Sequence, residues 1–160
     1  MQRRSSNFLS GGMSALLFPI AMMIAISSCT SFNPEKLRKE ITSEESLWRG
    51  AALRDYSFYY RIGCLCPPEA QRPVIITVRN GSVAGAIYSD TRGPVPADLL
   101  PNYPTIDKLF NDLRDGSDGA KDMDVRFDPT YGYPRSMNIE VEDVPEGVNF
   151  FRADSVRPIR

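Results

Sequence analysis

The feature that most constrains the fold is the alternation of side chains over residues 56–66, which read Tyr-Ser-Phe-Tyr-Tyr-Arg-Ile-Gly-Cys-Leu-Cys. The even-numbered positions carry aromatic, aliphatic and cysteine side chains, whereas the odd-numbered positions include polar and small ones. A period of two with aromatic enrichment predicts a half-buried β-strand. Because aromatic side chains bury large apolar areas, we expect Tyr56, Phe58 and Tyr60 to form the centre of a small core.

Residues 1–28 have the pattern of a secretory signal peptide: two arginines, an apolar run over residues 13–26, and then small residues. The run is shorter than the roughly 20 residues that a membrane-spanning helix needs. Residues 26–29, which follow from the end of this run, read Ile-Ser-Ser-Cys and resemble the bacterial lipobox. The resemblance implies a diacylglycerol on Cys29, cleavage before it and acylation of the new N-terminus, and several acyl chains give stable anchoring. An ordinary cleaved signal peptide with an incidental cysteine is the alternative.

The lipid on Cys29 makes a membrane the first expected partner and places the chain in the cell envelope. Thr30, and not an aspartate, follows the acceptor cysteine. By the sorting rule of the lipoproteins that this pattern resembles, we expect an outer-membrane protein that faces the periplasm.

The chain after the leader is expected to consist of a tether and one domain. Residues 29–41 are polar and charged, which favours a tether between the membrane and the domain. A short helix is the alternative, because Asn33 followed by Pro-Glu is typical of a helix start. Residues 42–160 suffice for a single domain with one modest core.

Two segments have the periodicity of amphipathic helices. Residues 42–53 begin with a Thr-x-x-Glu capping box, and their apolar face includes Leu47 and Trp48. Residues 105–115 begin with a threonine cap, carry apolar residues at i, i+3, i+4 and i+7, and are expected to end at Gly116.

Further strands are predicted at residues 74–79, 82–88, 123–128 and 136–142. The tail, with Val148, Phe150 and Phe151 followed by residues 155–159, is expected to close one last edge strand. The turn Asn80-Gly81 joins the first two as a hairpin, since both of its residues accept positive φ. Residues 89–104 are a proline-rich connection, and long loops of this kind are frequent binding surfaces. Together the patterns predict an α+β fold, with a mostly antiparallel sheet of four to five strands and both helices packed on one face.

Several classes of function are disfavoured by composition. The chain has 19 Lys and Arg against 20 Asp and Glu, a net charge of −1, and no basic patch, so nucleic acid is not an expected partner. It contains no histidine, which excludes Ser-His-Asp and Cys-His catalysis and histidine-based zinc sites. No phosphate-binding glycine loop occurs. The acidic run over residues 112–128 does not match an EF-hand loop, which leaves a weak cation site as a minor alternative. We therefore expect no enzyme activity, cofactor or metal.

The pair Cys64 and Cys66 is the nearest feature to chemistry. In a regular strand their α-carbons would lie roughly 6.5 Å apart, near the upper limit of about 6.8 Å for a disulfide. A bond thus requires the chain to bend at Leu65, which Gly63 and the following Pro-Pro would help. A structural disulfide is the preferred interpretation. Two reduced thiols and a redox or Cu(I) pair are the alternatives.

Several motifs in fixed order resemble a family of small secreted bacterial domains. They are Trp48, Tyr56-Ser57-Phe58, Cys64-x-Cys66, Asn80-Gly81, Pro104-Thr105-Ile106-Asp107-x-Leu109-Phe110 and Asp128-Pro129-x-Tyr131-Gly132-Tyr133-Pro134. That family is a domain of unknown function that often occurs in lipoproteins. The resemblance covers about residues 48–142 and implies no particular activity.

The function that these features favour is that of a non-catalytic envelope lipoprotein which binds a partner protein or a cell-wall component. A thiol redox or Cu(I) module that uses Cys64 and Cys66 is the alternative. A hydrolase with unrecognised catalytic carboxylates is a third hypothesis.

Overall fold

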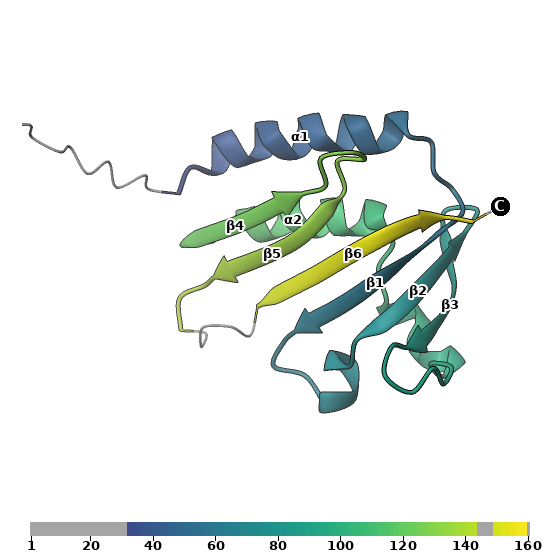
Figure 1. Cartoon of the computed structure of the whole chain (residues 1–160). Helices are drawn as coiled ribbons and strands as arrows, with labels where there is room; N and C mark the ends of the chain where they lie inside the picture. Colours follow the sequence, from purple (N-terminus) through teal and green to yellow (C-terminus); the bar gives the residue numbers. More distant parts are fainter. Residues whose placement is uncertain (1–31, 144–148, 160) are drawn as a thin grey trace, which may run out of the picture. The chain divides into compact units, whose positions relative to one another are not determined.

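The structure is a computed structural model that describes residues 32–143 and 149–159 (Figure 1). The predicted leader, its acceptor Cys29 and residues 29–31 of the predicted tether lie outside the described residues. The elements in chain order are α1 (Pro34–Gly50), β1 (Tyr56–Gly63), the 3₁₀ helix η1 (Pro68–Gln71), β2 (Val74–Arg79), β3 (Ser82–Tyr88), the 3₁₀ helix η2 (Ala97–Asn102), α2 (Ile106–Ser117), β4 (Asp122–Phe127), β5 (Pro134–Glu140) and β6 (Phe150–Pro158). Within the described ranges, no helix has the length and apolar character needed to cross a membrane.

The strands form one antiparallel sheet in the order β3-β2-β1-β6-β5-β4. The chain makes the meander β1–β2–β3 and passes through η2 and α2 to the far edge. It then returns by the meander β4–β5–β6, so that β6 pairs with β1 at the centre (Figure 1). Each meander follows one α-helix, so the domain is an αβββ unit built twice.

This architecture confirms the α+β class and the antiparallel sheet, but the predicted element counts were too low. The described residues contain six strands, and two 3₁₀ helices in addition to the two α-helices. The last strand is central and not an edge, because it begins at Phe150 and pairs with both β1 and β5. Phe151 and Ala153 are the buried residues of this strand and face the core.

The core is centred on the even-numbered residues of β1, as the alternation predicted. Tyr56, Phe58 and Tyr60 are buried and form a continuous series of ring contacts. Trp48 is 3 % exposed and meets Tyr56 edge-on, with ring centroids 5.2 Å apart. The Tyr56 hydroxyl accepts a hydrogen bond from the backbone N–H of Ile106 at 3.1 Å, which ties the first turn of α2 to β1. Burial raises the pKa of Tyr56 to about 12, so the hydroxyl stays neutral.

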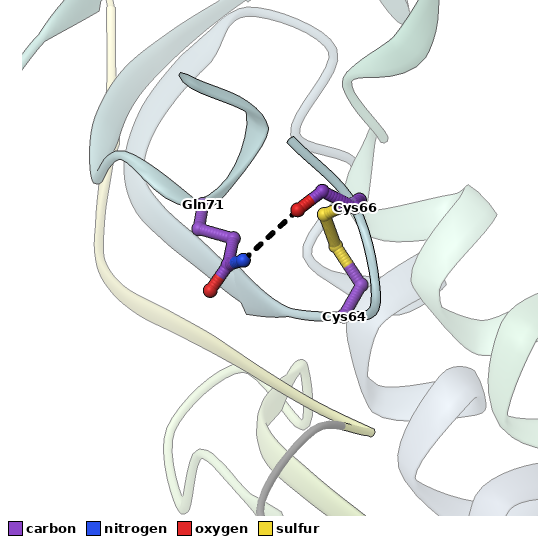
Figure 2. The surroundings of a disulfide bond; sticks show 3 residues. All are labelled: Cys64, Cys66 and Gln71. Carbon is purple, nitrogen blue, oxygen red and sulfur yellow. Dashed lines mark hydrogen bonds between the residues drawn. A yellow bond between two sulfur atoms is a disulfide. The ribbon is translucent and has the colours of Figure 1, made fainter. Parts of the chain in front are cut away.

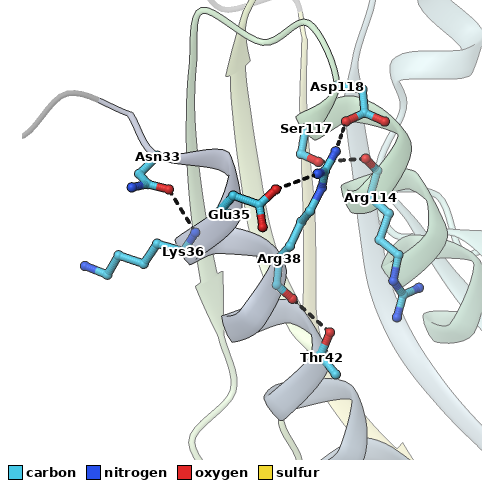
Figure 3. Close-up of polar contacts among 8 residues, drawn as sticks. All are labelled: Asn33, Glu35, Lys36, Arg38, Thr42, Arg114, Ser117 and Asp118. Carbon is cyan, nitrogen blue, oxygen red and sulfur yellow. Dashed lines mark hydrogen bonds and ion pairs between the residues drawn. The ribbon is translucent and has the colours of Figure 1, made fainter.

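Helix α1 begins eight residues before the predicted start at residue 42, so residues 34–41 of the predicted tether are helical. Asn33 caps it by accepting a hydrogen bond from Lys36 N–H at 3.0 Å (Figure 3). Thr42 lies inside the helix, and its hydroxyl donates to the carbonyl of Arg38 at 2.9 Å (Figure 3). The buried face consists of Leu37, Ile41, Glu45 and Trp48. Leu47, which was expected on that face, is 52 % exposed.

Ion pairs join α1 to α2. The carboxylate of Glu45, a residue only 8 % exposed, pairs with Arg49 on its own helix at 2.8 Å and with Arg114 on α2. Nearer the start of α1, Arg38 pairs with Glu35 at 3.0 Å and with Asp118 just after α2 (Figure 3). These pairs link the two helices at the edge of the core.

Helix α2 follows its predicted pattern closely. Thr105 accepts a hydrogen bond from Lys108 N–H at 3.2 Å, and the four predicted apolar residues are buried. The expected end at Gly116 was wrong, since the helix continues to Ser117. The Ser117 hydroxyl donates to the carbonyl of Arg114 at 2.7 Å, which stabilises that last turn (Figure 3).

Two turns position the sheet. The Asn80-Gly81 hairpin is confirmed, with φ of 51° and 77° at its two residues. In the turn before β5, Gly132 has φ of 72° and lies against α1, where a Cβ would overlap the carbonyl oxygen of Glu44. The next residue, Tyr133, is buried against Trp48, with ring centroids 6.3 Å apart. The Gly-Tyr-Pro segment thus joins β5 to the first helix.

Candidate functional site

The Cys64–Cys66 loop forms where β1 leaves the sheet. Gly63 is the register partner of Phe150 on β6, and a Cβ at Gly63 would overlap the Phe150 ring unless that ring moved. The chain bends after Gly63 and brings the α-carbons of Cys64 and Cys66 to 5.2 Å, closer than in a regular strand. Their sulfur atoms lie at disulfide-bonding distance (Figure 2). The predicted bend is therefore present, and the oxidation state of the pair stays a prediction.

The loop is held on one side and exposed on the other. The side-chain amide of Gln71, at the end of η1, donates a hydrogen bond to the Cys66 carbonyl at 3.1 Å (Figure 2). Leu65, between the two cysteines, is 76 % exposed and is one of two large apolar side chains left exposed in the described residues. The fold thus presents an apolar side chain on a loop of restricted conformation.

A mostly apolar groove adjoins this loop, with a volume of about 360 Å³. We call it the Cys64 groove. It is lined by the end of β1, by the Cys64–Cys66 loop and η1, and by η2 with the residue after it: Tyr60, Ile62, Cys64, Cys66, Pro67, Glu69, Ala70, Leu99, Asn102 and Tyr103. The fold therefore brings together the cysteine pair and the proline-rich loop 89–104, which sequence analysis selected separately.

The groove wall carries little charge. Burial raises the pKa of both Tyr60 and Tyr103, so their hydroxyl groups are neutral at physiological pH. At the rim, Glu69 pairs with Arg72 at 3.3 Å. Arg72 also binds the carboxylate of Asp90 at 2.9 Å and lies 3.7 Å above the ring of Tyr88. These contacts hold η1 against the end of β3 and leave the groove suited to an apolar side chain of a ligand.

The groove offers limited chemistry of its own. Two half-buried sulfur atoms make a redox couple or, as thiolates, a soft two-ligand site for Cu(I). Among the described residues there is no cluster of three or more histidine, cysteine or carboxylate side chains arranged to hold a metal ion.

Three of the acidic residues in the run that suggested a weak cation site have structural partners. Asp112 pairs with Lys108, and Asp118 with Arg38. Asp128 accepts backbone hydrogen bonds from Thr130 and Tyr131 at 2.9 and 2.8 Å, and so shapes the turn before β5.

Sequence analysis missed a second concave surface, on the face of the sheet opposite the core. Exposed arginines from three strands, Arg61, Arg126 and Arg152, line it. Arg61 at an odd position of the first strand was its only sequence signal. The pairing of β1 with β6, which brings Arg152 beside it, is not readable from a single sequence.

Comparison with known proteins places the chain in a family without giving it a role. No curated protein and no solved structure matches it. A family whose description reads "family of unknown function (DUF6174)" matches residues 40–145, about two thirds of the chain. The matched range runs from within α1 to just past β5 and leaves out β6. The chain belongs to this family, DUF6174.

Proposed function

We propose that the chain is a lipid-anchored domain of the bacterial cell envelope, whose folded part binds a partner protein or a cell-wall component and catalyses no reaction. The pattern before Cys29, which resembles a lipobox, supports the anchor and a periplasm-facing position on the outer membrane. The lack of histidine in the sequence supports the non-catalytic part.

The observation that carries the binding role is the exposed Leu65 beside the Cys64 groove. A leucine that is 76 % exposed costs hydration free energy in the isolated domain. A partner that covers Leu65 and fills the groove recovers that cost, and apolar anchors in pockets dominate the energy of many protein interfaces. The bend at Cys64–Cys66 fixes the loop before binding, which lowers the entropy lost on association.

Site-specific photo-crosslinking in living cells tests this role, with the crosslinking residue placed at position 65. The matched control is position 47, on α1, where the other exposed leucine is 52 % exposed. We expect a discrete crosslinked product from position 65 and none from position 47. Equal products from both positions, or no product from position 65 in any growth condition, would contradict a binding site at the groove.

The close approach of Cys64 and Cys66 supports one second candidate, a module that uses the pair for thiol redox chemistry or, when reduced, for Cu(I) binding. Alkylation of the two thiols in reduced protein, with and without Cu(I), tests the metal part of this candidate. If Cu(I) protects both thiols from alkylation at stoichiometric concentration, the metal function gains support. If alkylation proceeds at the same rate with and without Cu(I), the metal function is excluded.

A further inference from the structure

A row of arginines crosses the face of the sheet that the helices leave uncovered. In the strand register, Arg61 on β1 lies opposite Arg152 on β6, Arg152 opposite Ser136 on β5, and Ser136 opposite Arg126 on β4. Neighbouring residues in these strands, such as Tyr60 and Phe151, face the core, so the alternation of side chains directs the row to the opposite face. All three arginines are exposed.

The charges of this row are incompletely neutralised. Arg61 and Arg152 lie directly opposite each other, which is an unfavourable arrangement for like charges. Arg152 is 3.6 Å from Asp154, but that carboxylate is bound more closely by Arg135, at 3.2 Å. Arg61 lies 5.9 Å from the ring centre of Phe150 and has no carboxylate at ion-pair distance among the described residues. Arg126 lies 3.6 Å from Asp124. With Arg135 included, four arginines face the two carboxylates Asp124 and Asp154, so the surface keeps a positive charge on a chain whose net charge is −1.

Polar and aromatic side chains surround the row. Arg61 and Arg152 border a hollow of about 610 Å³. Tyr59, Phe150 and Asn138 also line it, together with the carboxylates of Asp124 and Asp154, which pair with arginines of the same surface. Arg152 and Ser136 are shared with a second hollow of about 320 Å³, which Arg126 borders. Two strand spacings separate Arg152 from Arg126, roughly 10 Å. The site thus offers two positive positions along a surface that also carries aromatic rings.

The chemistry of this surface distinguishes between classes of anionic ligand. Strands β1, β6 and β5 are interior, and Arg152 and Ser136 pair with residues of both neighbouring strands, so a peptide cannot bind at this row by adding a strand. Recognition has to use side chains alone. Guanidinium groups form bidentate hydrogen bonds with carboxylates, and aromatic rings pack against the apolar faces of sugar rings. An extended glycan that carries a carboxylate on each sugar can place carboxylates against both positive positions at once.

We propose that the row formed by Arg61, Arg152 and Arg126 binds the carboxylates of an acidic polysaccharide, whose sugar rings pack on Tyr59 and Phe150. The binding uses neither the Cys64 groove nor the lipid anchor, so its test is independent of the partner binding proposed at that groove.

Calorimetric titration of the full chain in nonionic detergent tests the proposal, with oligogalacturonate as the probe. Neutral dextran of matched length and poly-L-glutamate are the comparison ligands. We expect binding of oligogalacturonate that weakens as salt is added, and no binding of dextran. Arg61→Gln and Arg152→Gln should each weaken it about ten-fold or more, since each removes a charge-assisted contact. Arg92→Gln, at an exposed arginine in the turn after β3, is the matched control and should bind normally.

A melting temperature no lower than that of the wild type would show that the variants remain folded, because the first two substitutions relieve like-charge repulsion. Arg126→Gln, on the edge strand β4, provides a further test that does not affect the centre of the sheet. Absence of oligogalacturonate binding would overturn the proposal, and so would wild-type affinity in both Arg61→Gln and Arg152→Gln. Equal affinity for poly-L-glutamate would assign the surface to an acidic protein segment and would also overturn it.

Discussion

Gly132 is the residue on which the contact between the Gly-Tyr-Pro turn and α1 depends. Its φ is 72°, and a Cβ there would overlap the Glu44 carbonyl oxygen and lie 2.9 Å from the Cβ of Leu47. A substitution at this position therefore combines backbone strain with a collision against a helix that is fixed by its own packing.

We expect Gly132→Ala to lower the free energy of unfolding by about 2–4 kcal/mol, measured by chemical denaturation. Gly81→Ala is the matched control, because Gly81 has φ of 77° but open space around the position of a Cβ. It should cost only the strain of a left-handed residue, about 1–2 kcal/mol. Equal costs at the two positions would show that the turn does not press against α1.

The oxidation state of Cys64 and Cys66 is a second question at the scale of single residues. The protein isolated from an oxidising compartment should show no free thiols when it is unfolded and alkylated, and two after reduction. The double variant Cys64→Ser, Cys66→Ser should lose at most about 1–2 kcal/mol of stability, since closing so small a ring restricts the unfolded chain little. Its location in the cell should not change. Two alkylatable thiols without prior reduction would contradict the disulfide.

At the scale of elements, the start of α1 decides whether residues before 42 belong to the domain. Asn33→Ala should destabilise the protein by about 1 kcal/mol, because it removes the side-chain cap of the helix. Thr42→Ala should change stability by less than about 0.5 kcal/mol, because Thr42 is exposed in the helix interior. Thermal or chemical denaturation of both variants checks this. The reverse ranking would place the helix start at the capping box.

The elements also show how far the sequence alone leads. The period of β1, the Asn80-Gly81 hairpin and the apolar face of α2 were predicted because each is encoded by neighbouring residues. The start of α1 was misplaced because both Asn33 and Thr42 have the chemistry of a cap, and only burial of Leu37 and Ile41 decides between them. The central position of β6 was missed because strand order depends on contacts between distant segments.

The same distinction applies to the candidate sites. Cys64 and Cys66 were selected from their spacing, and the proline-rich loop from its composition. The sequence alone does not show that the cysteine pair and the loop both line the Cys64 groove. They do so because η1 and η2 are brought together by the pairing of the strands between them. The arginine row could not be predicted, because it depends on the pairing register of four strands. The parts of the Cys64 groove were therefore predictable from local sequence, whereas the arrangement of both surfaces depends on the topology.

At the scale of the whole molecule, two αβββ units share one sheet and one core. The pairing of β1 with β6 joins the first meander to the last and places the C-terminal strand at the centre. Because β6 lies beyond the range matched by the family, a chain cut after residue 145 would lose its central strand. The folded domain thus depends on its C-terminal segment.

Lipid attachment at Cys29 is the feature on which the cellular part of the proposed function depends, because it sets the compartment in which the Cys64 groove meets a partner. Metabolic labelling with a palmitate probe, followed by detergent phase partitioning, measures it directly. The wild-type chain and the Cys64→Ser, Cys66→Ser control should both be labelled and enter the detergent phase. Cys29→Ser should lose the label and remain in the aqueous phase. Unchanged labelling and partitioning of Cys29→Ser would contradict a lipid-anchored envelope domain.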